Sequence, residues 1–243
     1  MDAAIGRVID EIERQGLTES TLVIFMGDNG MNCGHHGIWG KGNGTSPPNM
    51  YDTSIKVPCI IAQPGRIRAG HLSGDLLSGY DVFPTLLEYA GLAEPTGKEK
   101  PGRSFASVLA GGSLPEPEGI VVYDEYGPVR MVRTRDWKYV HRYPDGPHEL
   151  FDLVGDRDER INRIDDPTMG NVAGALRDQL SRWFSAYVDP RRDAIDKGVT
   201  GCGQIGLSED AAPQHPVFAD GHLNGADWDL WLANGNATPH APE

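Results

Sequence analysis

This sequence of 243 residues lacks the features that mark several classes of protein. It has three cysteines and no C-x-x-C pair, which argues against a disulfide framework and against a structural zinc site. No apolar run approaches the ~18 residues that a membrane span needs, so we expect no membrane span. The start of the chain has no charged segment followed by an apolar one, so we expect no export signal in this chain, and its compartment stays open.

Positive charge is also scarce. The chain has 22 Lys and Arg against 35 Asp and Glu, which gives a net charge of −13. No local basic patch interrupts this excess, and its negative field would repel a nucleic acid, so we expect no nucleic-acid partner. The excess of carboxylates is compatible instead with binding of a cation. With 39% hydrophobic and 23% charged residues, the chain can bury a core.

The first part of the chain alternates helices and strands. Apolar residues at positions 5, 8, 9 and 12 form one stripe of a helix that begins near residue 2 and ends at Gly16. Residues 21–26 and 57–62 are continuously apolar, the pattern of parallel strands that are covered on both faces. Residues 81–90 predict a helix with proline in its first turn. This alternation indicates an α/β domain.

The pattern changes after a linker rich in Gly, Pro and Glu at residues 111–119. Short apolar segments separated by turns predict an antiparallel meander with strands at 120–126, 129–134, 138–143 and 148–153. An amphipathic helix follows, with its apolar face at Leu176, Leu180, Trp183, Phe184 and Tyr187.

We therefore predict three parts in the chain. Residues 1–115 form the α/β portion, and residues 116–192 form a small subdomain of antiparallel sheet plus helix. Residues 193–243 form an acidic extended tail that has no Lys or Arg beyond Lys197. This tail carries two isolated tryptophans, Trp228 and Trp231, and we expect it to wrap around the protein body or a partner.

Two oxygen-bearing side chains follow the first predicted strand. Asp28 and Asn29 stand where that strand ends, which is where open α/β sheets place ligand sites. A carboxylate and an amide carbonyl suit a hard cation such as Ca²⁺ or Mg²⁺. The alternative is that Asp-Asn-Gly forms only a turn, since Asn-Gly is a strong turn dipeptide.

Two imidazoles and an ammonium follow in the same polar segment. His35, His36 and Lys41 lie within a stretch rich in Gly and Asn, between residues 30 and 54. Lysine supplies a point charge for sulfate or phosphate oxygens, and histidine can donate a proton to a leaving oxygen, so the group predicts an anionic substrate. Zinc binding by the histidines with Cys33 is the alternative, although adjacent histidines rarely converge on one ion.

The order of these motifs resembles the sulfatase family of the alkaline phosphatase superfamily over residues 2–190. The resemblance rests on TLVIFMGDNG, GHHGIWGKG, MYDTSIKVPCIIAQPG, DVFPTLLEYAGL, VRTRDWKYV and ELFDL. It implies the C-terminal part of an alkaline phosphatase-like α/β fold, with Asp28 and Asn29 as calcium ligands. It also implies that Lys41 contacts the sulfate, that His36 belongs to the same catalytic motif, and that His35 lies beside the substrate.

The sequence departs from the family pattern in important ways. None of its cysteines or serines stands in the Cys-x-Pro-x-Arg or Ser-x-Pro-x-Arg motif that yields the formylglycine nucleophile, and the family's first pair of metal-binding aspartates is missing. The family's Tyr-Glu and Arg are replaced by Tyr51-Asp52 and Lys56, which leaves a role of these residues near the substrate open. We therefore expect the C-terminal half of a sulfatase, inactive alone, with the formylglycine in a missing N-terminal half.

The resemblance implies a sulfated small molecule or sulfated carbohydrate as the substrate of the complete enzyme. Two alternatives stay open. One is a phosphate or phosphonate ester hydrolase of the same superfamily, although Asn29 in place of histidine favours sulfate. The other is a non-catalytic truncated module that binds or assembles. The organic part of the substrate and the oligomeric state are not determined by these residues.

Overall fold

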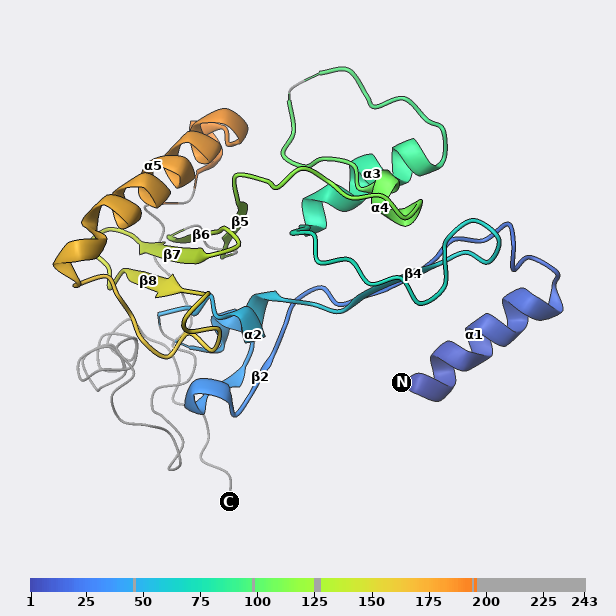
Figure 1. Ribbon diagram of the computed structural model, residues 1–243, viewed down its shortest axis with the longest axis horizontal. Coiled ribbons are helices and arrows are strands. Elements are labelled where there is room, and N and C mark those ends of the chain that lie inside the picture. The colour runs from blue at the N-terminus through green and yellow to red at the C-terminus, as the bar shows by residue number, and fades with distance from the viewer. Residues whose placement is uncertain (46, 98, 125–127, 194, 196–243) are drawn as a thin grey trace, which may run out of the picture. The chain divides into compact units, whose positions relative to one another are not determined.

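The computed structural model describes residues 1–45, 47–97, 99–124, 128–193 and 195, shown in colour in Figure 1. These residues divide into two compact units, each described by itself. Unit 1 comprises residues 1–28 and 57–118, and unit 2 comprises residues 29–56 and the chain from 119 onward. Almost all of the predicted tail, including Trp228 and Trp231, lies outside the described residues, and the predicted boundaries at 115 and 192 remain predictions.

Unit 1 contains the predicted helix–strand–strand–helix order. Its elements are α1 (Asp2–Arg14), β1 (Val23–Met26), β4 (Cys59–Ala62), α3 (Val82–Tyr89) and the short α4 (Ala106–Leu109). Proline stands in the first turn of α3, as predicted, because the missing amide hydrogen needs no partner there. None of the helices in the described part of the chain is long and apolar enough to cross a membrane.

The predicted direction of the two apolar strands is wrong. β1 and β4 pair antiparallel, with Val23 opposite Ala62 and Met26 opposite Cys59, and form a two-stranded sheet within the described residues. Neither strand is covered on both faces, since the side chains of Met26 and Ile60 are 41% and 61% exposed. A continuous apolar run indicates burial but not strand direction, which depends on the neighbouring strand.

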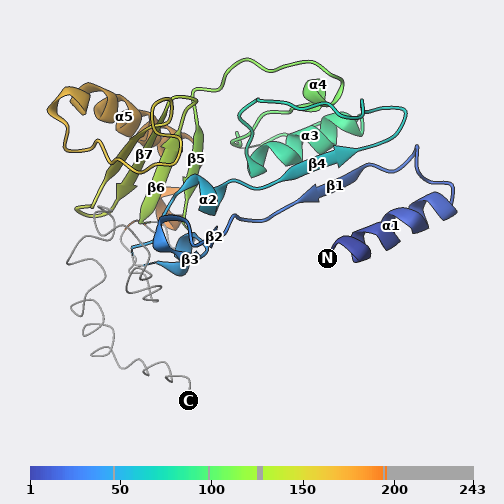
Figure 2. The same cartoon turned by 60° about the horizontal axis from the view of Figure 1, so that its bottom comes forward.

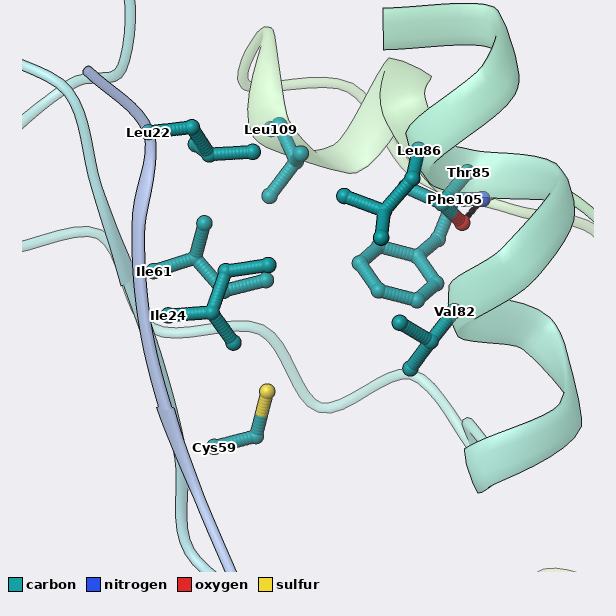
Figure 3. A pocket seen from close by; sticks show the side chains of 9 residues that line it. All are labelled: Leu22, Ile24, Cys59, Ile61, Val82, Thr85, Leu86, Phe105 and Leu109. Carbon is teal, nitrogen blue, oxygen red and sulfur yellow. Dashed lines mark hydrogen bonds between the residues drawn. The ribbon is translucent and has the colours of Figure 1, made fainter.

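The interior of unit 1 lies between this strand pair and the helices α3 and α4. Figure 3 shows side chains of the strand pair pointing toward those of the helices across an apolar pocket. Its lining is almost entirely hydrocarbon: Leu22, Ile24, Cys59, Ile61, Val82, Thr85, Leu86, Phe105 and Leu109. This pocket offers no charged group for catalysis, so the candidate chemistry lies elsewhere.

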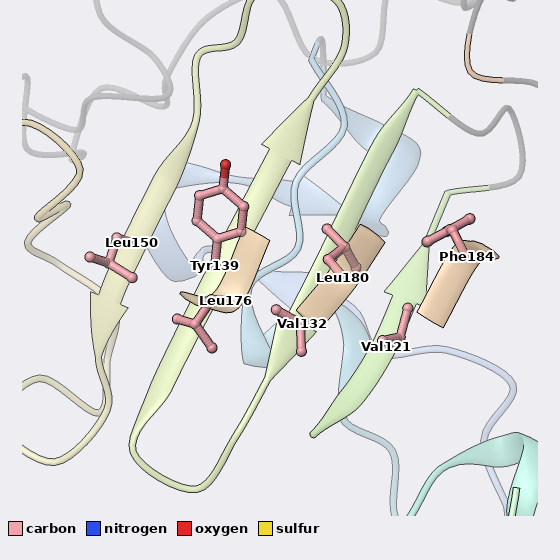
Figure 4. Close-up of a cluster of buried hydrophobic side chains, with 7 residues drawn as sticks. All are labelled: Val121, Val132, Tyr139, Leu150, Leu176, Leu180 and Phe184. Atoms are coloured by element: carbon pink, nitrogen blue, oxygen red, sulfur yellow. The ribbon is translucent and has the colours of Figure 1, made fainter. Parts of the chain in front are cut away.

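Unit 2 is built on a four-stranded antiparallel meander, as predicted. The strands β5 (Ile120–Tyr123), β6 (Val129–Arg133), β7 (Trp137–Arg142) and β8 (Glu149–Asp152) lie in sequence order. The helix α5 (Gly170–Tyr187) packs on one face. Figure 4 shows the core that the sheet and helix share, formed by Val121, Val132, Tyr139, Leu150, Leu176, Leu180 and Phe184.

The segment 29–56 covers the other face of this sheet, as Figure 2 shows. It contains only short pieces of regular structure, which are β2 (Asn32–Cys33), η1 (His35–Gly37), β3 (Trp39–Gly40), η2 (Gly42–Gly44) and α2 (Asp52–Ile55). Its buried side chains join two small clusters with the sheet, Ile38 and Tyr51 with Phe151 and Leu153, and Met50 with Val129, Met131 and Val140. Successive side chains of β7 point to opposite faces of the sheet, and both faces are buried, one by α5 and the other by the segment 29–56.

Candidate functional site

Asp28 and Asn29 follow the end of β1 after Gly27, as the sequence predicts. The Asp28 side chain is exposed, and Nδ2 of Asn29 donates to the carbonyl of Gly30 at 2.8 Å. Gly30 is required here because a Cβ at this position would lie 2.4 Å from the carbonyl oxygen of Thr53. The amide of Gly30 also donates to the carbonyl of Ser54 at 2.9 Å, so the backbone beside Asn29 is fixed against α2.

These two residues fit a hard divalent cation in kind but supply only part of its shell. Both offer oxygen, which Ca²⁺ and Mg²⁺ prefer, whereas calcium takes about six to eight oxygen ligands. Among the described residues, no three His, Cys, Asp or Glu side chains gather in a group that could hold a metal ion. The residues of the zinc alternative, His35, His36 and Cys33, form no such group within the described part of the chain.

His36 is held in an unusual conformation by its neighbours. Its φ of 54° and ψ of 20° are left-handed, which costs a residue other than glycine roughly 1–3 kcal/mol. Its ring stacks on that of Tyr51, with centroids 3.9 Å apart and planes 12° from parallel. Tyr51 is 1% exposed and packs against Phe151 of β8. The orientation of the imidazole is thus set by the core of unit 2.

His35 and Lys41 are exposed at the ends of two short turns in the same segment. The backbone next to Lys41 is fixed by Asn49, whose side chain is fully buried. Nδ2 of Asn49 donates to the carbonyl of Gly42 at 3.2 Å, and its backbone amide donates to the same oxygen at 2.9 Å. The exposed side chain of Lys41 thus extends from a backbone whose next residue, Gly42, is held by the hydrogen bonds of Asn49.

A buried polar network joins this part of the segment to α2. Nδ2 of Asn32 donates to Oγ of Ser54 at 2.6 Å, and the hydroxyl of Ser54 in turn donates to Oδ1 of Asn49. All three side chains are buried, and each has a partner, as buried polar groups require. Nothing in the sequence pattern marks these three residues as buried, because Asn and Ser in a polar segment look like ordinary turn residues.

Asp52 faces the sheet. Its Oδ1 accepts from Nζ of Lys138 at 2.6 Å, and its Oδ2 pairs with Arg133 at 3.2 Å. Its backbone amide donates to Oε2 of Glu159 at 2.7 Å, and Lys138 also pairs with Glu159. Burial alone would raise the pKa of Asp52, but the charges and hydrogen bonds of Lys138 and Arg133 outweigh it and lower that pKa to about 2. These ion pairs anchor α2 to the sheet of unit 2.

A second buried cation of β7 holds the same segment. Arg142 is 2% exposed, donates through Nη2 to the carbonyl of Pro48 at 3.2 Å, and pairs with Glu149 at 2.8 Å. Lys138 donates to the carbonyl of Met50 at 2.9 Å. The two cations are four residues apart on one face of β7, so a single strand fixes the segment on both sides of Asn49. The sequence feature that could have revealed these anchors is the spacing of Lys138 and Arg142, which places two cations on one face of a predicted strand.

Comparisons with known proteins identify the family of this chain. The family described as "N-sulphoglucosamine sulphohydrolase, C-terminal" matches residues 34–185. The choline-sulfatase of Rhizobium meliloti is 33% identical over 170 residues, which are 69% of this chain and 31% of the relative. The N-acetylglucosamine-6-O-sulfatase of Bacteroides thetaiotaomicron is 30% identical and matches 67% of this chain and 30% of its own length. The chain thus spans about a third of these curated relatives.

Solved structures show the same likeness. One is a complex with its substrate, D-glucosamine-2-N,6-O-disulfate, with a TM-score of 0.68 and 27% identity over 81% of this chain and 40% of that chain. Another is the phosphonate monoester hydrolase of Silicibacter pomeroyi, with a TM-score of 0.66 and 25% identity over 78% of this chain and 39% of that chain. This likeness confirms the predicted fold class, an α/β chain with the fold of the C-terminal part of an alkaline phosphatase-like sulfatase.

Proposed function

Since this chain belongs to the sulfatase family, we propose that it is the C-terminal part of an enzyme that hydrolyses a sulfate ester. The observation that carries the proposal is the segment 29–56, which presents His36 and Lys41 from a backbone fixed by buried hydrogen bonds and ion pairs. Preorganised charge of this kind is what stabilises an anionic transition state. The relatives' names support sulfate as the group that is transferred.

In this proposal the chain binds and neutralises the sulfate. The ammonium of Lys41 contacts sulfate oxygens and balances the charge that develops on them. The imidazole of His36, held against Tyr51, donates a proton to the ester oxygen as the bond from sulfur to that oxygen breaks. His35 contributes a second polar contact with the substrate.

Two further groups complete the proposed reaction. Asp28 and Asn29 would hold a calcium ion, or alternatively magnesium, which screens the negative charge of the sulfate when bound. The nucleophile would be a formylglycine outside this chain. We expect a sulfated carbohydrate or a sulfated small molecule as the substrate.

Activity of a protein that contains this chain together with the family's N-terminal half tests the proposal. We expect Lys41→Ala and His36→Ala each to lower kcat/KM for an aryl sulfate by about 10²-fold or more, as loss of a charge-stabilising or proton-donating group does. Lys100→Ala removes an exposed lysine of unit 1 and serves as the control. Equal activity of all these variants would contradict the proposal and favour a non-catalytic module.

The chain alone should not turn over an aryl sulfate, because loss of a covalent nucleophile leaves only a small part of the rate enhancement. Turnover by the purified chain that disappears in Lys41→Ala would show that the nucleophile is present here.

A second candidate is hydrolysis of a phosphate or phosphonate ester, which the likeness to phosphonate monoester hydrolase favours. The same preparation decides between the two, since kcat/KM for an aryl sulfate and for an aryl phosphonate can be compared directly. A sulfate preference supports the first proposal, and a phosphonate preference replaces it.

A further inference from the structure

Two histidines lie side by side on the face of the unit 2 sheet that carries α5. His141 of β7 and His148, which immediately precedes β8, continue the antiparallel pairing in which Val140 lies opposite Glu149. Their half-buried rings stack with centroids 4.1 Å apart and planes 19° from parallel. The ring of Tyr143 also contacts His141, with centroids 4.3 Å apart. The proposed reaction uses neither of these imidazoles.

Hydrogen bonds fix which nitrogen of each ring carries the proton. Nδ1 of His148 accepts from the backbone amide of Arg142 at 3.3 Å, so neutral His148 carries its proton on Nε2. Nδ1 of His141 lies 2.7 Å from the hydroxyl of Tyr139, whose pKa burial raises to about 12. This hydroxyl keeps its proton and donates to Nδ1, because a phenol is a stronger donor than a neutral imidazole. Both rings therefore present an N–H donor at Nε2, the outer end of the side chain.

The backbone that carries His148 is held in place by its neighbours. Its carbonyl accepts from Nδ2 of Asn162 at 3.1 Å, and the carbonyl of Pro147 accepts from Nη1 of Arg142 at 2.7 Å. A Cβ at Gly146 would lie 2.9 Å from the amide nitrogen of His148, and the φ of Gly146 is +103°, so this turn requires glycine. The donors are thus preorganised, and a ligand has to order little of the protein when it binds.

Arg177 of α5 supplies a positive charge beside the two rings. Its guanidinium is exposed and forms no ion pair with a carboxylate in the described part of the chain. Burial, helped by the charges of His148 and Arg177, lowers the pKa of His141 to about 4. Burial also lowers the pKa of His148, to which Arg142 and Arg177 contribute. Both histidines are therefore neutral near pH 7, and the charge of Arg177 acts on both.

The other charged groups around the two histidines have partners of their own or oppose the cations. Arg130 of β6 is buried and pairs with Asp193. Arg142 lies on the opposite face of β7 and pairs with Glu149 at 2.8 Å. Asp145 is exposed in the turn after β7, and its negative charge offsets part of the positive charge at His148. Arg177 is thus the cation beside the rings that is available to a ligand.

We propose that His141, His148 and Arg177 form a binding site for a tetrahedral oxyanion such as sulfate or phosphate, either free or as the end group of an ester. Three donor groups match the oxygens of such an anion better than the two oxygens of a carboxylate. A metal ion would need a ring nitrogen with an available lone pair, which neither ring offers. The site lies on α5, β7 and the turn before β8, and it does not depend on Lys41 or on the proposed function.

Binding at this site should depend on pH in a defined direction. A bound anion stabilises the protonated form of a neighbouring imidazole, so it raises the pKa of His141 and His148, and binding takes up protons. Affinity should therefore rise as the pH falls toward the pKa values of the two histidines. Sulfate is the suitable probe, because it keeps both of its negative charges over this range of pH.

NMR titration of the full 243-residue chain tests the site, with the imidazole resonances of His141 and His148 as the readout. Inorganic sulfate, glucosamine 6-sulfate and acetate are the three probes. We expect inorganic sulfate or the sulfate ester to shift both imidazoles and to bind severalfold more tightly near pH 5 than near pH 7. The tighter of these two probes identifies whether the site takes the free ion or an ester. Acetate that binds as tightly as either would contradict a tetrahedral site.

Variants of exposed residues test the site without disturbing the core. Arg177→Gln should weaken sulfate binding about tenfold or more, the effect of losing a charge-assisted hydrogen bond. Arg182→Gln is the matched control, since Arg182 is another exposed arginine of α5 that lies about 140° around the helix. Equal losses in the two variants would show a general charge effect and overturn the site.

A third variant separates this site from the candidate sulfate site. Lys41→Ala should leave the response of both imidazoles to sulfate unchanged. If Lys41→Ala abolishes that response, or if saturating sulfate does not move the imidazole resonances, the site at His141, His148 and Arg177 is wrong. The proposed function is unaffected by either result, because it rests on Lys41 and His36.

Discussion

At the scale of single residues, Lys138 links the sheet of unit 2 to the candidate site. Replacing it with methionine would leave the carboxylates of Asp52 and Glu159 without their buried cation. Breaking a buried ion pair from one side typically costs about 3–5 kcal/mol, so we expect Lys138→Met to lower the free energy of unfolding by that amount in urea titrations.

A double variant provides the check on this mechanism. Lys138→Met combined with Glu159→Gln removes the carboxylate that loses its cation, whereas Asp52 keeps its ion pair with Arg133, so the double variant should recover part of the loss. The exposed-lysine variant Lys100→Ala, which loses only a surface contact with the ring of Phe83, should change stability by about 1 kcal/mol or less. A loss under 1 kcal/mol in Lys138→Met would mean that the network does not anchor α2.

Calcium binding is the second property decided by individual residues. Asp28 and Asn29 supply at most half of the six to eight oxygens that calcium prefers, and water must supply the rest. We therefore expect the isolated chain to bind calcium weakly, on the order of millimolar or worse, in titration calorimetry. Micromolar binding that is lost in Asp28→Ala would show that further carboxylates of this chain complete the site.

At the scale of elements, His141 of β7 and His148, which immediately precedes β8, form a pair of imidazoles that should make unit 2 sensitive to acid. The rings of His141 and His148 stack with centroids 4.1 Å apart, and Nδ1 of His141 lies 2.7 Å from the hydroxyl of Tyr139. Burial lowers the pKa of His141 to about 4, helped by the positive charges of His148, Arg177 and Arg130. Burial lowers the pKa of His148 as well.

The sign of the effect follows from the direction of these shifts. An unfolded histidine takes up its proton near pH 6.5, whereas folded His141 does so only near pH 4, so the unfolded state binds more protons between these values. Stability should be fully present above pH 6.5 and fall by about 1–2 kcal/mol toward pH 4, a figure that allows for solvent screening at a half-buried ring. Urea titrations at several pH values should show that the free energy of unfolding falls from pH 6.5 to pH 4, and His141→Gln should reduce this fall. If the variant shows the same fall, groups other than His141 cause it.

The helices and strands also show which features of the fold can be predicted from sequence patterns. The strands of unit 2 and α5 could be predicted to within a few residues, because alternation and helical periodicity record which side chains face a core. The candidate site residues after β1 and in the segment 29–56 are chosen for their chemistry and remain predictions. The pairing of β1 with β4, and the support of His36 by Tyr51, could not, since both depend on partners that local pattern does not specify.

At the scale of the whole molecule, the two units should differ in stability. α1 has no buried residue, and β1 is at most partly buried, whereas β6 and β7 lie between two packed faces. We expect amide hydrogens of β1 and β4 to exchange faster than those of β6 and β7, because local opening exposes less apolar surface there. Hydrogen exchange of the monomeric chain measures this directly, and equal protection of β1 and β7 would show that unit 1 is stable as it stands.

The anchoring of the 29–56 segment by β7 also has a consequence for biosynthesis. A ribosome completes Asp52 well before its partners Lys138 and Glu159, which follow 86 and 107 residues later. At about 5–20 residues per second, the delay before Glu159 is made lasts roughly 5–20 s. During that time the segment 29–56 has no sheet to pack on, so Ile38, Met50 and Tyr51, which are buried in folded unit 2, are without the side chains that later cover them. The candidate site is thus the first part of unit 2 to be translated, and its anchors are complete only after the sheet has been made.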